Sequence, residues 1–297
     1  MATQKSRSSR PGTTRGDEAV RTVRSATAGE LAYTEYGPAS GTPVVWFHGT
    51  PGSRRLGSLF EAAATDCGVR LLAFDRPGYG RSPPWPSRTV RDGAQCAAAV
   101  LDDADVDSAG AVAFSGGAPY ALAAAATRSD RIDRVDLVSG AVPPEMTEEP
   151  PAIQRLLRGM AAATPRLLRG LFRGQAWLAR HREPSFVVSQ YTAGDATEGI
   201  PERAAEVVRA DFVEALSRSR RGVVTEFRHA GGDWNVPFDE IDADVCLWHG
   251  ALDTNVPIAG ARRLESALPT ATLRVLDDAD HLRTLLESVP EILAGYD

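Results

Sequence analysis

Short apolar segments alternate with helical patterns along the first half of the chain. The segments 43–47, 69–74 and 109–114 are nearly continuous apolar runs, which are typical of strands buried on both faces of a sheet. Short strands that alternate with helices imply right-handed crossovers and a mostly parallel sheet. The pattern predicts strands at 31–36, 43–47, 69–74, 109–114 and 135–138, and helices at about 54–67, 91–105 and 118–127.

The alternation stops at Pro143 and resumes about a hundred residues later. From Pro143 to about Phe238 the pattern is helical, is interrupted by prolines and contains no strong strand. Strands are predicted again at 244–248 and 271–276, each followed by a helix. We therefore expect one α/β core with a helical cap inserted into it. The predicted boundaries are 29–142 and 239–297 for the core and 143–238 for the cap.

Outside this core, the composition bears on location and partners. The first 28 residues are polar and basic and lack the apolar centre of a secretory signal, so we expect a disordered tail at 1–28. No window approaches the roughly 18 apolar residues of a membrane span, so we expect no stable membrane insertion. The three cysteines have no spacing typical of a zinc site or a disulfide framework, which favours a reducing cytoplasm. A net charge of −6 argues mildly against nucleic acid as a partner.

Three polar residues come shortly after predicted strands at widely separated points of the chain. They are Ser115, Asp253 and His281, in that order. The carboxyl ends of parallel strands meet at one edge of a sheet, which would bring the three side chains together. A serine, an imidazole and a carboxylate are the groups of a catalytic triad. We therefore predict that Ser115 is the nucleophile, His281 the general base and Asp253 the residue that orients His281.

Ser115 stands in the setting that a nucleophile elbow requires. Its neighbours two positions away, Ala113 and Gly117, are small enough for a sharp strand-to-helix turn. A helix that begins directly behind the serine would point free N–H groups at the reacting oxygen. The alternative is that Ser115 only caps that helix.

Asp253 and His281 also have alternatives. Asp253 could cap the helix that follows it, although Thr254 or Asn255 could do so equally well. Among the other histidines we expect His249 to be packed at a strand end. The acids nearest His281 in sequence are worse placed to face its ring; these are Asp277, Asp278 and Asp280.

The loop 48–53 follows another buried strand. Loops of this type supply one backbone donor to an oxyanion hole, and we expect Thr50 N–H to act together with Gly116 N–H. The alternative is a simple Gly/Pro turn after a strand.

These pieces together resemble the α/β-hydrolase superfamily, in its single-domain form with a helical cap. The resemblance covers about residues 29–297 and implies an eight-stranded sheet with the cap over the active site. It also implies that Asp75 and Arg76 form a structural turn. The motifs that carry it are His48-Gly-Thr-Pro-Gly, 75–82, Ser115-Gly-Gly, Gly250-Ala-Leu-Asp253 with Val256-Pro257, and Asp280-His281.

Three positions depart from the pattern of that family. Ala113 stands where Gly is more frequent, and Gly116 where many members have a larger residue. Asp280 stands where Gly is frequent and would place a charge beside the base.

The predicted cap is rich in arginine. The segment 155–182 contains seven arginines and no acid, interleaved with leucine and aromatic residues. The pattern favours an amphipathic cover that solvates its arginines. There are two alternatives. One of the arginines could bind a substrate carboxylate, or the segment could attach weakly to an anionic membrane. The candidate substrate contacts are His48, Trp177, Tyr191 and Trp234.

The sequence therefore predicts an enzyme that hydrolyses a small-molecule ester, thioester or amide through an acyl-enzyme intermediate. This chemistry requires no metal and no organic cofactor. The alternatives are a proline iminopeptidase-like aminopeptidase, a C–C bond hydrolase, and a low-turnover binding or tailoring member of the same fold. Both a monomer and a homodimer remain open.

Overall fold

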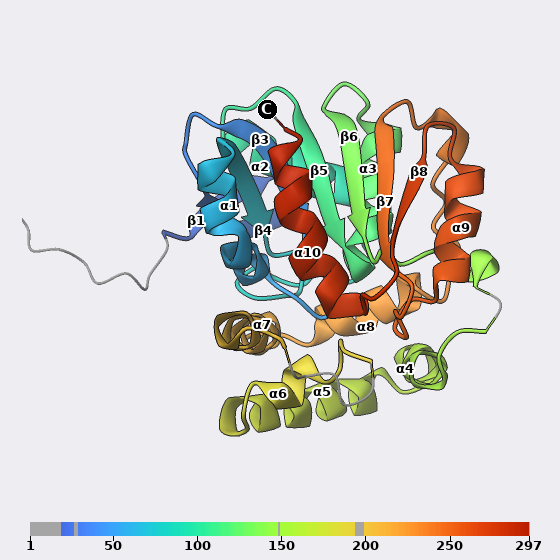
Figure 1. Ribbon diagram of the computed structural model, residues 1–297. Coiled ribbons are helices and arrows are strands. Elements are labelled where there is room, and N and C mark those ends of the chain that lie inside the picture. Colours follow the sequence, from blue (N-terminus) through green and yellow to red (C-terminus); the bar gives the residue numbers. More distant parts are fainter. Residues whose placement is uncertain (1–18, 27–28, 148, 194–198, 297) are drawn as a thin grey trace, which may run out of the picture.

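Eight strands form one sheet in the spatial order β1-β2-β4-β3-β5-β6-β7-β8 (Figure 1). The computed structural model describes residues 19–26, 29–147, 149–193 and 199–296. Strand β2 pairs antiparallel with β1 and β4, and all other neighbouring strands run parallel. The predicted mostly parallel, eight-stranded α/β fold is confirmed. The strands are β1 Arg21–Ser25, β2 Gly29–Tyr36, β3 Thr42–Phe47, β4 Val69–Phe74, β5 Ala109–Phe114, β6 Ile132–Val138, β7 Asp244–Gly250 and β8 Thr272–Leu276.

The first strand corrects the prediction of a disordered tail at 1–28. β1 is an edge strand that pairs with β2, and the side chain of Val23 is buried under it. Arg21 Nη1 lies 2.5 Å from Glu35 Oε1 and Arg21 Nη2 lies 3.2 Å from Asp103 Oδ2. A strand with one inward apolar residue carries too little periodicity to be recognised in the sequence. Residues 1–18 and 27–28 of the predicted tail lie outside the described residues.

Helices cover both faces of the sheet (Figure 1). Those of one face pack into one hydrophobic cluster, and those of the other face pack into a second cluster together with the insert. On the first face lie α2 Gly93–Asp103, α3 Ala118–Thr127 and α9 Ile258–Ala267. On the second lie η1 Arg54–Phe60, α1 Glu61–Asp66 and α10 His281–Ala294.

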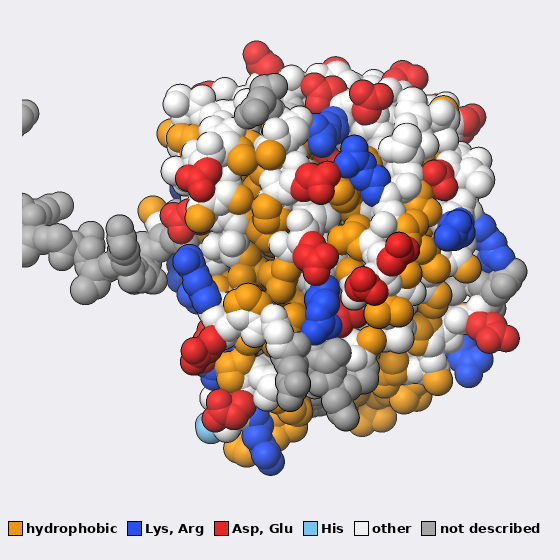
Figure 2. Space-filling view, viewed as in Figure 1, with side chains coloured by type: hydrophobic (Ala, Val, Ile, Leu, Met, Phe, Trp, Pro, Cys, Tyr) orange, Lys and Arg blue, Asp and Glu red, His pale blue; other side chains and the backbone are white. Residues whose placement is uncertain are grey.

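Between β6 and β7 the described residues contain helices and no strand. These helices form a layer across the carboxyl ends of the strands (Figure 1). Five large hydrophobic side chains of α4 and α5 are exposed, and hydrophobic atoms gather along this lower edge of the molecule (Figure 2). The helices are η3 Pro144–Met146, α4 Ala152–Ala163, α5 Pro165–His181, α6 Ser185–Val188, α7 Glu202–Ala215, α8 Arg221–His229 and η4 Phe238–Glu240.

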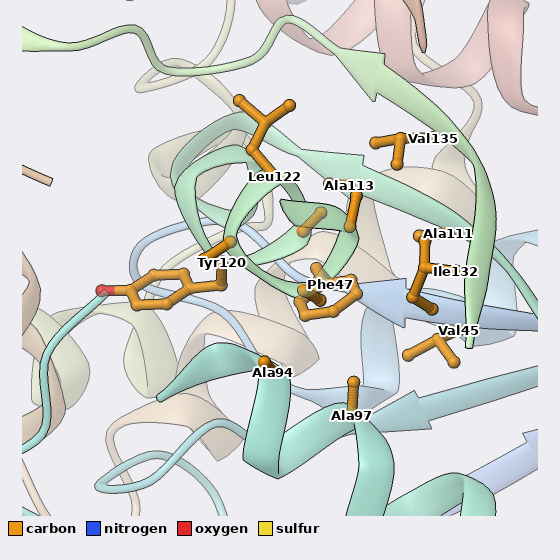
Figure 3. Packing of buried hydrophobic residues seen from close by; sticks show 14 of the residues in the cluster. Val45, Phe47, Ala94, Ala97, Ala111, Ala113, Tyr120, Leu122, Ile132 and Val135 are labelled. Atoms are coloured by element: carbon orange, nitrogen blue, oxygen red, sulfur yellow. The ribbon is translucent and has the colours of Figure 1, made fainter. Parts of the chain in front are cut away.

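Strand β5 lies at the centre of the core, and every residue of it is buried. Its alanines, among them Ala111 and Ala113, belong to one hydrophobic cluster with Phe47 of β3 and with Ala94 and Ala97 of α2 (Figure 3). Close packing of small residues holds the end of β5 in a rigid frame.

None of the described helices is both long and apolar enough to cross a lipid bilayer.

Candidate active site

Ser115 lies at the turn between β5 and α3, where the sequence predicts a strained elbow. Its φ is 51°, in the left-handed region that a serine rarely adopts. A Cβ on Gly117 would lie 2.4 Å from the carbonyl oxygen of Phe47, so a small residue is required there. The Ser115 hydroxyl makes no hydrogen bond to another described residue, which argues against a capping role. The side chain is thus held at a strand end without a structural partner.

Asp253 and His281 form a buried pair. His281 Nδ1 lies 2.7 Å from Asp253 Oδ2, and both residues are buried. The other oxygen, Asp253 Oδ1, accepts the backbone N–H groups of Asn255 at 2.8 Å and Val256 at 2.9 Å. Burial by itself would raise the pKa of Asp253, but the adjacent His281 ring and the hydrogen bonds hold it below its usual value. The carboxylate therefore stays ionised and fixes the orientation of the ring.

The rival residues are engaged elsewhere. Asp280 caps α10 by accepting the N–H of Arg283 at 2.9 Å, and its other oxygen lies 2.6 Å from Arg283 Nη1. His249 is packed as predicted and donates from Nε2 to the carbonyl of Val256 at 2.8 Å. Asp277 and Asp278 are exposed.

The His281 ring is close to two aromatic rings. The centroid of Phe114, the residue before Ser115, is 4.9 Å away, and the ring of Tyr191 is nearly parallel to it, with a centroid distance of 6.2 Å and an interplanar angle of 10°. In the part of the chain that the structure describes, no hydrogen bond joins Ser115 to His281. Hydrogen bonds between catalytic groups are often long in unliganded enzymes and tighten when substrate binds.

Thr50 and Gly116, the predicted oxyanion donors, are in direct contact. A Cβ on Gly116 would lie 2.3 Å from Thr50 Oγ1 and 3.3 Å from Thr50 N. The loop after β3 and the elbow after β5 therefore approach each other as closely as a glycine permits, which places the two backbone segments beside Ser115.

Glu226, on α8 of the insert, holds this loop. Its carboxylate accepts from Thr50 Oγ1 at 2.5 Å and is almost fully buried. Burial alone would raise the pKa of Glu226, but the charges of Arg76 and Arg88 outweigh that effect and hold the pKa well below its usual range. The sequence analysis missed this residue. Its other donors are Arg76 Nε at 2.7 Å, Arg76 Nη2 at 2.8 Å, Arg88 Nη2 at 2.7 Å and Tyr79 OH at 3.0 Å.

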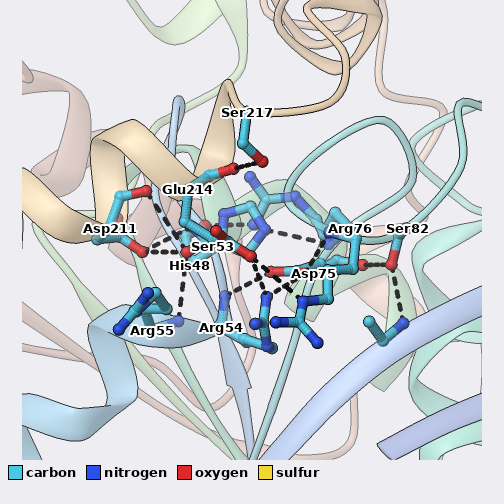
Figure 4. Close-up of polar contacts among 12 residues, drawn as sticks. His48, Ser53, Arg54, Arg55, Asp75, Arg76, Ser82, Asp211, Glu214 and Ser217 are labelled. Carbon is cyan, nitrogen blue, oxygen red and sulfur yellow. Dashed lines mark hydrogen bonds and ion pairs between the residues drawn. The ribbon is translucent and has the colours of Figure 1, made fainter. Parts of the chain in front are cut away.

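Asp211, on α7, is a second buried acid that the sequence analysis missed. Its Oδ1 accepts from Ser53 N at 2.8 Å, Ser53 Oγ at 2.7 Å and Leu56 N at 3.1 Å (Figure 4). Burial raises the pKa of Asp211 to about 7, although these hydrogen bonds oppose the shift. The only available signal is the helical spacing, which puts Asp211 on the apolar face of α7 with Val208 and Ala215.

Asp75 and Arg76 lie in the structural turn that the family resemblance implies. Asp75 accepts from Arg54 N at 2.8 Å and Arg81 N at 2.9 Å, and pairs with Arg54 Nη1 at 2.7 Å. Arg76, which lies close to His48 in Figure 4, donates to the carbonyl oxygens of His48 and Gly49. It also donates to Glu226.

A small, mostly apolar cavity lies beside this site. Of the four residues that the sequence analysis offers as substrate contacts, Tyr191 lines this cavity and the other three do not. His48 is buried, and both of its ring nitrogens bond to backbone groups, at 2.7 Å to Gly49 O and 3.1 Å to Arg76 N. Trp177 is exposed on α5, and Trp234 packs into the core cluster on the α2–α3 face. The lining residues are Gly49, Pro51, Leu56, Phe114, Tyr191, Val208, Asp211, Leu282 and Leu285.

His229, the last residue of α8, forms hydrogen bonds through both nitrogens of its ring. Its Nδ1 accepts from Tyr120 OH at 2.8 Å and its Nε2 donates to Arg88 O at 2.9 Å. Burial and the charge of Arg88 lower the pKa of His229 to about 4.

Within the described residues no three His, Cys, Asp or Glu side chains gather in a way that could hold a metal ion.

Two curated proteins are similar in sequence to part of this chain. Over 129 residues the chain is 33% identical to a non-heme chloroperoxidase of Streptomyces lividans, covering 43% of this chain and 46% of that protein. Over 126 residues it is 29% identical to a haloalkane dehalogenase of Mycolicibacterium paratuberculosis, covering 41% of this chain and 42% of that protein. The chain thus matches less than half the length of these two curated relatives.

Structural similarity extends over nearly the whole chain. The bromoperoxidase from Bacillus anthracis aligns with a TM-score of 0.74 at 19% identity, covering 94% of this chain and 99% of that one. Residues 42–287 match the family model described as alpha/beta hydrolase fold. The resemblance expected from the sequence motifs is confirmed, and the chain belongs to the alpha/beta hydrolase fold family.

Proposed function

We propose that the protein is a serine hydrolase that cleaves a small-molecule ester, thioester or amide. The observation that carries the proposal is the buried pair of His281 and Asp253. These residues follow β8 and β7, and Ser115 follows β5, in the parallel part of the same sheet. A carboxylate that binds one nitrogen of an imidazole makes the other nitrogen available as a base. The strained elbow at Ser115 supports the same assignment.

The reaction would proceed in two halves. Ser115 Oγ attacks the substrate carbonyl carbon while His281 Nε2 takes the hydroxyl proton. The negative charge on the carbonyl oxygen is stabilised by the backbone N–H groups of Thr50 and Gly116. His281 then returns the proton to the leaving group, and the acyl group stays on Ser115. Water, deprotonated by His281, releases the acid and restores the serine.

The cavity beside the site favours an apolar substrate group. Most of the side chains that line it are apolar, and the two polar ones are Tyr191 and Asp211. The apolar ones include Leu56, Phe114, Val208, Leu282 and Leu285. Apolar walls would bind an acyl chain or an apolar alcohol. Among the described residues that line this cavity there is no arginine, so none is in position to bind a substrate carboxylate there.

The nucleophile can be tested by covalent labelling. A fluorophosphonate probe should add one mass increment to the intact protein, on Ser115. Ser115→Ala should abolish the adduct and lower kcat by at least about a thousandfold while the fold is retained. A matched control is Ser139→Ala, because Ser139 also lies at a strand end with positive φ, at 46°. Labelling that survives Ser115→Ala would contradict the proposal.

The substrate class requires a separate comparison. A chain-length series of nitrophenyl acyl esters, assayed beside a proline aminoanilide, would separate esterase from aminopeptidase activity. We expect turnover of the esters, with a preference for apolar acyl groups that fit the small cavity.

A further inference from the structure

A second groove lies on the insert, separate from the cavity beside Ser115. It has a volume of about 430 Å³ and shares no lining residue with that cavity. Helix α5 forms one wall, and the segment that joins α7 to α8 forms the other. The lining residues are Arg166, Arg169, Gly170, Arg173, Arg218, Ser219, Arg220 and Arg221.

The six guanidinium groups of this groove have no acidic partner among the residues that the structure describes. None of them makes an ion pair with any described residue, whereas the buried Arg54, Arg76 and Arg88 all pair with carboxylates. Arg220 Nε is buried and has no hydrogen-bond partner among the described groups. Burial and the charges of Arg173 and Arg180 lower the pKa of Arg220. The groove therefore concentrates positive charge that no acidic side chain in the described part of the chain neutralises through an ion pair.

Such an arrangement is unfavourable without an anion. Like charges that line one concave surface repel each other, and the low dielectric of the walls strengthens the effect. The cluster is also notable in a chain whose net charge is −6. Every basic group in the groove is an arginine, and its planar fork matches the oxygens of a phosphate group.

We propose that this arginine groove binds a phosphate-bearing ligand. The phosphate could belong to a free phosphorylated molecule or to the headgroup of an anionic phospholipid. The second source is worth testing because Leu167, Leu171 and Trp177 of the same helix α5 are exposed. The inference does not depend on the proposed hydrolase activity, since it concerns a different surface and is tested by binding.

Titration calorimetry with inorganic pyrophosphate at constant ionic strength tests the free-ligand source. The groove variant Arg169→Gln/Arg173→Gln should bind pyrophosphate about a hundredfold more weakly than the wild type, because charge-assisted hydrogen bonds are lost. The control Arg155→Gln/Arg203→Gln makes the same change of net charge at two exposed arginines outside the groove. It should bind like the wild type. An equal loss in both variants would mean non-specific charge attraction and would overturn the proposal.

Flotation with vesicles tests the lipid source. Phosphatidylcholine vesicles with and without phosphatidylglycerol are compared for the wild type and the same two variants. Binding that needs phosphatidylglycerol and is lost only in the groove variant assigns the phosphate to a lipid. Pyrophosphate binding without flotation assigns it to a free ligand. If the wild type binds neither, the proposal is wrong.

A thermal melt without anion guards against misfolding of the groove variant. Removing two like charges should leave its Tm equal to or above that of the wild type. If that variant unfolds instead, Arg218→Gln/Arg221→Gln replaces it, since both residues are exposed.

Discussion

His281 Nδ1 lies 2.7 Å from Asp253 Oδ2, which joins the first residue of α10 to the loop that follows β7. The ionised carboxylate fixes the tautomer of the ring, with the proton on Nδ1. His281 Nε2 is then the nitrogen that is available as a base, and it has no partner among the described residues.

Replacing Asp253 by Asn should lower kcat by about a thousandfold, because the neutral amide no longer stabilises the imidazolium. Steady-state kinetics on a nitrophenyl ester measures the effect. The matched control is Asp280→Asn, adjacent to His281, whose side chain caps α10 and whose replacement is an equally good cap. If the two variants lost similar activity, Asp253 would have no special role.

Thr50 and Gly116 should be energetically coupled. Gly116→Ala places a Cβ 2.3 Å from Thr50 Oγ1 and should lower kcat/KM by about a hundredfold through displacement of the loop. The same substitution should cost much less in a Thr50→Gly background, where the obstructing side chain is absent. A double-mutant cycle on kcat/KM measures this coupling, and additive effects would contradict it.

Glu226→Gln should destabilise the fold by about 3 to 5 kcal/mol, because it leaves Arg76 and Arg88 buried without a full counter-charge. Denaturant unfolding measures the loss. The control Glu214→Gln removes a partly exposed partner of Arg54, which keeps Asp75, and should cost less than about 1 kcal/mol. Equal losses would show that the Glu226 network has no particular weight.

Asp211 should make stability depend on pH. Because its pKa is raised in the folded state to about 7, the folded state binds the proton more tightly than the unfolded chain does. The associated stability is complete at pH below about 4 and is lost as the pH rises to about 7, by at most about 4 kcal/mol. Asp211→Asn should lack this pH-dependent loss, because an amide does not ionise. Its carbonyl oxygen can still accept from Ser53 and Leu56, so the variant should keep these hydrogen bonds.

The measurement is the difference in unfolding free energy between wild type and Asp211→Asn from pH 4 to pH 8, in which other titrations cancel. A difference that stays constant over this range would rule out the raised pKa.

The sequence by itself determined every strand of the sheet except β1, and the positions of Ser115, Asp253 and His281 after strands. Buried strands have continuous apolar runs, and β5 to β8 are parallel neighbours, so residues that follow them meet at one edge. Small residues around Ser115 are a local requirement of the turn, which a sequence displays directly. The role of each of these residues in catalysis stays a prediction.

Only the tertiary structure decided which side chains of the insert face the core. Helical periodicity defines an apolar face but not the surface that it meets. Asp211 and Glu226 are buried against loops that are far away in sequence. Trp177 is exposed, and neither it nor the arginines of α5 line the cavity.

The departure of Gly116 from the family pattern has the same kind of explanation. The room that a larger residue would occupy at position 116 is taken by Thr50, about 66 residues earlier in the chain. Close packing couples such distant positions, and no local pattern records the coupling, so the contact had to be read from the folded chain.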